Sequence, residues 1–167
     1  TAAPMFKKLS LELGGKNPNI IFADCNFEKA LKTTLLSSFA NQGQICLCGS
    51  RIFVEKPIYE KFKAAFVEAT KKLKVGDPND SNTNLGAIVS NDHLEKILSY
   101  VSLAKEEGGK VLTGGSKLSI EGDYSGGYFM EPTIIEGLEF DCRTNQEEIF
   151  GPVVTIMPFE TEEEIGR

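Results

Sequence analysis

The chain has 167 residues, a length that suits one domain with a sizeable core, and its 41% hydrophobic and 25% charged residues are ordinary for a folded protein. Its 18 Lys and Arg against 24 Asp and Glu give a formal net charge of −6 without a basic stripe, so we expect no nucleic-acid partner. The apolar runs fall far short of the roughly 20 residues of a membrane helix, so we expect no membrane association.

The first elements that the pattern predicts are strands over residues 9–13 and 19–23, followed by a helix over residues 27–40. Asp24 or Asn26 is the expected N-cap of this helix, and Gly43 follows its end. The apolar face of the helix consists of Phe27, Ala30, Leu31, Leu35 and Phe39.

A strand over residues 51–55 comes next, and a second helix begins at Pro57, a residue suited to a first helical turn, and ends before Gly76. A third helix is capped near residues 90–92, carries an apolar stripe from Leu94 to Ala104, and is stopped by Gly108 and Gly109. The remaining predicted elements are strands over 111–113, 128–135 and 153–158, with a polar surface loop over 116–127.

Strands that alternate with amphipathic helices predict an α/β fold with a largely parallel sheet flanked by helices. At the end of the chain, Thr161 and the three glutamates after it form a capping box at a helix start. Arg167 follows about one turn later, so we expect the chain to be cut inside an element, with a frayed natural terminus as the alternative. Thr1 in place of Met suggests that a natural N-terminus is missing as well.

The four cysteines are neither dense nor arranged as C-x-x-C, so neither a disulfide framework nor a zinc site is expected. With a single histidine, His93, the chain hardly has the ligands for a zinc site, and we expect no metal. Free thiols indicate a reducing compartment, and we expect a cytoplasmic protein. The cysteines are Cys25, Cys46, Cys48 and Cys142.

The segment 11–18 reads Leu-Glu-Leu-Gly-Gly-Lys-Asn-Pro. Glu12 lies at the end of a predicted strand, and Gly14 and Gly15 allow a sharp turn and close approach of a ligand. In an α/β fold such a strand end faces the edge where ligands bind, although a solvated rim residue is the alternative. A phosphate loop is rejected because the spacing is absent and Asn17 replaces its Ser or Thr.

Cys46 lies in a glycine-rich loop between a predicted helix and a predicted strand, in the segment 39–51. It is either a small buried hydrophobe or a reactive thiol whose thiolate is stabilised by backbone N–H groups. His93 forms no local cysteine–histidine signature, which argues against a papain-type protease. A third segment, 146–153, places Glu148 and Phe150 before a Gly-Pro turn, and its pattern alone fits a solvated loop equally well.

Together these three segments resemble the aldehyde dehydrogenase superfamily, which carries L-E-L-G-G-K-x-P, F-x-N-x-G-Q-x-C and E-E-I-F-G-P in this order. Segments 75–78 and 127–133 also fit, so the resemblance spans essentially the whole chain. It implies that residues 1–167 are part of a catalytic domain, without the N-terminal NAD-binding domain. Locally, residues 41–48 are most similar to the branch that oxidises aminomuconate and hydroxymuconate semialdehydes, with broad-specificity and retinal-oxidising branches as alternatives.

The resemblance implies that Cys46 is the catalytic nucleophile and Glu12 the general base. Glu148 would hold the nicotinamide ribose, with the aromatic Phe150 beside the nicotinamide. The cofactor-binding residues that the resemblance implies are Leu13, Gly14, Lys96, Glu148 and Phe150.

The implied reaction oxidises a small aldehyde to a carboxylic acid with NAD, or alternatively NADP, through a thiohemiacetal and a thioester on Cys46. Glu12 favours hydrolysis over transfer to coenzyme A. Relatives imply a homodimer or homotetramer. Because the family's second oxyanion donor and most adenosine contacts lie upstream, we expect the isolated chain to be inactive. A cofactor-independent thiol esterase and a non-catalytic scaffold or binding domain remain alternatives.

Overall fold

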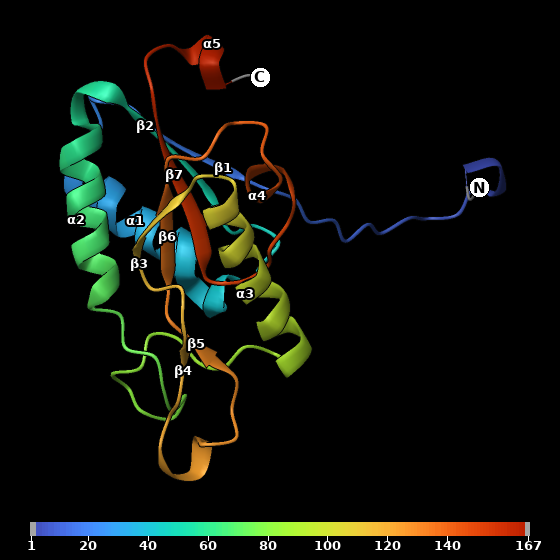
Figure 1. The fold of residues 1–167 in the computed structure, drawn as a ribbon. Helices are drawn as coiled ribbons and strands as arrows, with labels where there is room; N and C mark the ends of the chain where they lie inside the picture. Colours follow the sequence, from blue (N-terminus) through green and yellow to red (C-terminus); the bar gives the residue numbers. More distant parts are fainter. Residues whose placement is uncertain (1–2, 166–167) are drawn as a thin grey trace.

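The computed structural model describes residues 3–165 and has a five-stranded sheet at its centre (Figure 1). Adjacent strands pair in parallel except at one edge, where β3 runs antiparallel to β6. This confirms the predicted α/β fold with a largely parallel sheet. In spatial order the strands are β1 (Pro18–Ile21), β2 (Arg51–Glu55), β7 (Val153–Phe159), β6 (Thr133–Glu136) and β3 (Lys110–Thr113).

Helices cover both faces of the sheet, as the alternation of buried side chains along the strands requires. Ile134 packs with α1 (Phe27–Phe39) and α2 (Tyr59–Lys71) on one face, where Phe62 and Phe66 are fully buried. Ile135, the next residue of β6, packs with α3 (Asn91–Glu106) on the other. The core is therefore two apolar layers on either side of one sheet.

The predicted helix starts are confirmed in two cases. The Asn26 side chain accepts a hydrogen bond from the backbone N–H of Lys29 and caps α1, while Asp24 takes no part. Ser90 caps α3 in the same way, through the N–H of His93. The second helix differs, because Pro57 lies in a 3-10 turn, η3 (Lys56–Ile58), and α2 begins only at Tyr59.

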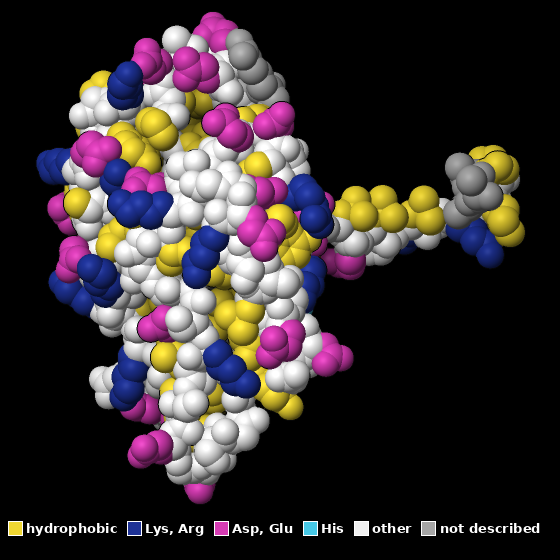
Figure 2. Space-filling view, in the orientation of Figure 1, with side chains coloured by type: hydrophobic (Ala, Val, Ile, Leu, Met, Phe, Trp, Pro, Cys, Tyr) yellow, Lys and Arg dark blue, Asp and Glu magenta, His cyan; other side chains and the backbone are white. Residues whose placement is uncertain are grey.

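The predicted strand over residues 9–13 is wrong. Residues 6–14, the N-terminal arm, run away from the sheet without strand pairing, and Figure 2 shows apolar side chains standing clear along them. Leu9, Leu11 and Leu13 are 60%, 70% and 72% exposed. Alternating leucines favour a strand, but a strand needs a partner, and the described residues supply none at this position. Before the arm lies a 3-10 turn, η1 (Ala3–Met5).

The predicted strand over 128–135 divides in two. Pro132 cannot donate a ladder hydrogen bond, and it separates β5 (Phe129–Met130) from β6. Nor is segment 116–127 only a loop, because β4 (Lys117–Leu118) pairs antiparallel with β5 and the turn η4 (Gly122–Tyr124) follows.

Two short helices complete the fold: α4 (Arg143–Gln146), which the sequence pattern did not predict, and α5 (Glu162–Ile165). At the start of α5 the Glu164 carboxylate accepts the N–H of Glu160 rather than that of Thr161, so the capping box is displaced by one residue. The expectation about Arg167 lies outside the described residues.

Within residues 3–165, no helix combines the length and apolarity needed to cross a bilayer. The same residues contain no group of three or more His, Cys, Asp or Glu side chains placed to hold a metal ion.

Candidate active site

The cysteine loop (residues 41–48) leaves α1 through the 3-10 turn η2 (Ala40–Gly43). Its first three residues, 41–43, all have left-handed backbone, with φ of 48°, 59° and 67°. Asparagine and glycine tolerate this region, whereas Gln42 is strained there. Three left-handed residues in succession reverse the chain sharply after the helix and direct it back toward β2.

Cys46 lies in a turn that is closed by a hydrogen bond from Cys48 N–H to Ile45 O at 3.0 Å. The Asn17 side-chain amide holds this turn from outside, because Nδ2 donates to Cys46 O at 2.7 Å and to Cys48 O at 3.2 Å. No described residue accepts a hydrogen bond from the Cys46 N–H. The turn therefore presents an exposed thiol together with an unused backbone donor.

Two glutamine side chains fasten the cysteine loop to the segment before α3. Gln42 Oε1 accepts from Gly86 N–H at 3.0 Å, and its Nε2 donates to Ala87 O at 3.3 Å. Gln44 Oε1 accepts from Val89 N–H at 3.2 Å. These bonds explain how the strained Gln42 backbone is retained, since the side chain satisfies two backbone groups at once.

The four cysteines have different environments, and only Cys46 is exposed. Cys48 is buried and donates its S–H to Ser38 O at 3.3 Å. Burial raises the pKa of Cys48 to about 11 and, less strongly, the pKa of Cys142. Cys25 is half-buried and packs beside the core. A reactive thiol must be accessible and ionised, so geometry alone selects Cys46.

Glu148 lies directly against the glycine pair that follows the arm. Its Oε1 accepts the Gly15 N–H at 3.0 Å, and a Cβ added to Gly14 would lie 2.2 Å from the same oxygen. Lys96, from α3, donates to the backbone carbonyl of Glu148 at 3.3 Å. A side chain at position 14 would thus displace the carboxylate, which explains why glycine is needed there.

Phe150 has a left-handed backbone, with φ of 61°, and His93 Nε2 lies 2.7 Å from its carbonyl oxygen. The next residue, Gly151, packs on α3 so closely that a Cβ would lie 2.5 Å from Ile97 Cδ1. On its other side, Gly151 O lies 2.2 Å from the position a Gly43 Cβ would take. Segment 147–151 is therefore wedged between α3 and the cysteine loop.

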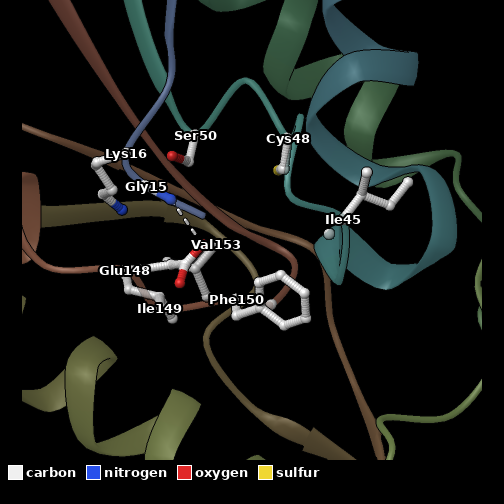
Figure 3. Close-up of a pocket in the computed structure, with 11 residues that line it drawn as sticks. Gly15, Lys16, Ile45, Cys48, Ser50, Glu148, Ile149, Phe150 and Val153 are labelled. Carbon is white, nitrogen blue, oxygen red and sulfur yellow. Dashed lines mark hydrogen bonds between the residues drawn. The ribbon is translucent and has the colours of Figure 1, made fainter. Parts of the chain in front are cut away.

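A small pocket lies where these segments meet (Figure 3). Lys16 and Ser50 are buried in its wall, and neither Lys16 Nζ nor Ser50 Oγ has a hydrogen-bond partner among the described residues. Burial lowers the pKa of Lys16 to about 8, against the opposing effect of nearby acidic groups. The lining residues are Gly15, Lys16, Gly43, Ile45, Cys48, Ser50, Glu148, Ile149, Phe150, Gly151 and Val153.

The structure brings most of the sequence-predicted site residues together, with two exceptions. Gly14, Lys96, Glu148 and Phe150 form one contact network, joined to the cysteine loop through Gly151 and Gly43. The exceptions are Glu12 and Leu13. Both are exposed on the N-terminal arm, and no hydrogen bond or ion pair joins Glu12 to any described residue.

Sequence reasoning missed the residues that hold the site. Asn17, Gln42 and Gln44 bond the cysteine loop, and His93 bonds Phe150. Asn17 and the two glutamines lie inside the motifs, but their hydrogen-bond partners are up to 45 residues away along the chain. Such pairing leaves no periodic signal, so only the folded geometry identifies it.

The sequence profile of the aldehyde dehydrogenase family matches residues 1–167. The chain belongs to this family. Among similar aldehyde dehydrogenases are two named 2-aminomuconic semialdehyde dehydrogenase, from Mus musculus at 54% identity and from Homo sapiens at 52%, each aligned over 98% of this chain and 34% of the relative. A betaine aldehyde dehydrogenase from Staphylococcus aureus, solved in complex with NAD+, superposes with a TM-score of 0.88 at 44% identity, over 98% of this chain and 32% of that one.

The lengths of these aldehyde dehydrogenases can be compared with that of the chain. It spans about a third of the length of the relatives that it matches. Another Staphylococcus aureus structure, with a TM-score of 0.89, contains NAD+ and a BME-modified cysteine. In this chain, Cys46 is the cysteine that is exposed.

Proposed function

We propose that residues 1–167 form part of the catalytic domain of an NAD(P)-dependent aldehyde dehydrogenase, whose N-terminal NAD-binding domain lies outside these residues, and that Cys46 is its nucleophile. One observation carries the proposal. Cys46 is the exposed thiol of the four, in a turn held by Asn17, and its loop contacts the segment that contains Glu148 and Phe150. The parent protein would oxidise an aldehyde to a carboxylic acid.

The chemistry of Cys46 follows from its turn. Its thiolate attacks the aldehyde carbon and forms a thiohemiacetal, whose oxygen carries developing negative charge. The free Cys46 N–H is the donor that this chain offers to that oxygen. A donor of this kind is worth on the order of 100- to 1000-fold in rate. Hydrolysis of the later thioester releases the acid and returns the thiolate.

The residues around Glu148 fit a nicotinamide dinucleotide. Glu148 Oε1 is engaged by Gly15 N–H, while no described residue donates to Oε2, which leaves this oxygen for a ribose hydroxyl. Glu148 would hold the ribose, Phe150 would lie beside the nicotinamide, and Leu13, Gly14 and Lys96 would border the cofactor. When bound, NAD, or alternatively NADP, accepts the hydride that converts the thiohemiacetal into the thioester.

Glu12 is proposed as the general base that activates water for thioester hydrolysis, a step typically worth roughly 100- to 10,000-fold. Glu12 is exposed on the N-terminal arm, and we propose that the arm changes position to bring Glu12 to a thioester on Cys46. The exposed leucines of the arm support such a change, because a partner strand from elsewhere in the parent protein would bury them.

The test uses the full reading frame that contains this chain. Formation of reduced cofactor from an aldehyde and NAD(P)+ is measured for the native protein, for Cys46→Ala and for the matched control Cys48→Ala. We expect loss of at least about 1000-fold in Cys46→Ala and a far smaller effect in the control, since Cys48 is buried and un-ionised. Full activity in Cys46→Ala would refute the proposal.

A muconic semialdehyde is the proposed substrate class. Relatives named 2-aminomuconic and 2-hydroxymuconic semialdehyde dehydrogenase, at 45% to 54% identity, support it. The values of kcat/KM for 2-hydroxymuconic semialdehyde and betaine aldehyde decide the question. We expect kcat/KM to be clearly higher for 2-hydroxymuconic semialdehyde. A higher kcat/KM for betaine aldehyde, which is cationic, would reject the proposed substrate class.

A second candidate function, a thiol esterase, needs no cofactor. It is favoured by the combination of an exposed Cys46 thiol and a free backbone N–H in one turn. Turnover of a chromogenic ester by this chain, abolished in Cys46→Ala, would support it. Equal turnover by native chain and variant would exclude it.

We further propose that the parent protein is a cytoplasmic homo-oligomer without nucleic-acid or membrane partners. The four free cysteines support a reducing compartment, and the net charge of −6 argues against nucleic acid. Light scattering of the full-length protein tests the oligomeric state, and fractionation of the source cells tests the cytoplasmic location.

A further inference from the structure

We propose that His93 is a positioning residue for hydride transfer, because its side chain holds Phe150 in a strained backbone conformation that sets where the Phe150 ring lies. The proposal rests on the function proposed above, in which Phe150 lies beside the nicotinamide. His93 lies on the first turn of α3, 57 residues away from Phe150 in the sequence.

The backbone of Phe150 is strained, and a contact must hold it in that conformation. Phe150 has φ of 61°, a region that is unfavourable for an L-residue, and unlike asparagine it has no side-chain group to offset that strain. The contact that holds it is the 2.7 Å hydrogen bond from His93 Nε2 to Phe150 O. The two rings also meet edge to face, at 6.2 Å between centroids and 64° between planes.

His93 is itself held in place. Its backbone N–H donates to the capping side chain of Ser90 at 3.2 Å, so the residue belongs to an ordered helix start rather than to a loose loop. A carbonyl oxygen can only accept, so Nε2 must carry the hydrogen. Both the neutral form protonated at Nε2 and the imidazolium keep this donor, and the positioning role therefore needs no positive charge.

The effect of this bond extends to the nucleophile. The residue after Phe150, Gly151, has no space for a Cβ against Ile97 of α3, and its carbonyl group, in the peptide to Pro152, leaves no space for a Cβ on Gly43. Gly43 lies three residues before Cys46 in the cysteine loop. The Phe150 carbonyl belongs to the peptide that precedes Gly151, so its rotation would shift Gly151 and with it the contact of this residue with the cysteine loop.

The experiment compares His93→Leu, which removes the donor, with His93→Gln, which retains an N–H group at similar reach, in the full-length protein. Glu95→Gln, an exposed position on the same helix, is the matched control. We expect kcat to fall about 10- to 100-fold in His93→Leu, the range that follows misplacement of a reacting group by about 1 Å. The deuterium isotope effect with an aldehyde labelled at C1 should rise as hydride transfer becomes limiting. His93→Gln should restore both values to within about threefold.

A merely structural role would lower the melting temperature without changing the isotope effect, and that result would overturn the proposal. Equal loss in His93→Gln and His93→Leu would also overturn it, because the ring and not the donor would then matter. A crystal structure of His93→Leu gives a readout that does not depend on activity: Phe150 should leave the left-handed region, and retention of its positive φ contradicts the inference. If the native protein oxidises no aldehyde, the proposed function fails, while the crystallographic result still decides whether His93 holds Phe150.

Discussion

Cys46 and Cys48 are two residues apart, yet the fold gives their thiols opposite properties. Cys46 is exposed at a turn, whereas Cys48 is buried and its pKa is raised to about 11. At pH 8 only about one Cys48 thiol in a thousand is therefore ionised. We expect iodoacetamide to alkylate Cys46 before Cys25, Cys48 and Cys142, as followed by mass spectrometry of tryptic peptides. Earlier modification of any other cysteine would contradict this.

A substitution of Gly14 tests the proposed cofactor contact of Glu148 separately from the chemistry of the Cys46 thiol. In Gly14→Ala the new Cβ would overlap the Glu148 carboxylate, 2.2 Å away, and break its bond to Gly15 N–H. We expect Kd for NAD(P)+ to rise about 10-fold or more, as for loss of one hydrogen bond to a charged group, with the alkylation rate of Cys46 unchanged. Gly126→Ala, where nothing lies within 4 Å of the added Cβ, is the control. Unchanged affinity in Gly14→Ala would exclude Glu148 as a ribose ligand.

Lys16 makes the stability of the protein depend on pH in a defined direction. Burial lowers its pKa from 10.5 to about 8, so between these values the unfolded amine holds a proton that the folded amine has lost. Raising the pH through this window therefore stabilises the fold, by up to about 3 kcal/mol. Burial of Cys48 acts oppositely between pH 9 and 11, because the folded thiol keeps its proton.

Lys16→Met isolates the effect of the amine when both proteins also carry Cys48→Ala, because the Lys16 amine lowers the pKa of Cys48 and the thiol would otherwise titrate differently in the two proteins. We expect the variant to be the more stable at pH 7, and its advantage in free energy of unfolding to shrink by about 3 kcal/mol toward pH 10. Urea unfolding of both proteins between pH 7 and pH 10 measures this difference in free energy of unfolding. A difference that does not vary with pH would show that Lys16 is not desolvated.

At the scale of elements, the cysteine loop is joined to the sheet by the close contact between Gly43 of η2 and the Gly151–Pro152 peptide, which directly precedes β7. Gly43 combines a φ of 67° with a Cβ position 2.2 Å from Gly151 O, and backbone atoms on both sides prevent adjustment. Gly122 has a φ of 78° in open space, so Gly122→Ala measures the conformational cost alone.

We expect Gly122→Ala to destabilise the protein by about 1 kcal/mol and Gly43→Ala by roughly 3 kcal/mol or more, because overpacking adds to the strain. Denaturant midpoints of the two variants give the comparison, and the alkylation rate of Cys46 should change only in Gly43→Ala. Equal destabilisation of the two variants would show that the backbone around Gly43 adjusts to the added Cβ without a further loss of stability.

At the scale of the whole molecule, the N-terminal arm lies exposed in this chain. The Glu12 carboxylate bonds to no described residue, and the leucines around it are exposed. We expect the isolated chain to show no aldehyde-dependent reduction of NAD(P)+, even with Cys46 intact. Measurable reduced cofactor, absent in Cys46→Ala, would mean that the arm and the cofactor site assemble without further protein.

The sequence by itself determined the α/β class, the caps of α1 and α3, and the family to which the chain belongs. These follow from local information, since periodicity, capping side chains and contiguous motifs are all read within a few residues. It also singled out Gly14, Lys96, Glu148 and Phe150, which the structure brings into one network.

Only the tertiary structure decided which residues hold the site and which predicted element lacks a partner. The bonds of Asn17, Gln42, Gln44 and His93 join positions 29 to 57 residues apart, and the contact of Gly43 with Gly151 joins positions farther still. The strand expected over residues 9–13 has the right alternation but no neighbour among the described residues. A strand and a hydrogen-bonded loop both depend on partners that are distant in the sequence, and a local sequence pattern does not indicate which residues these partners are.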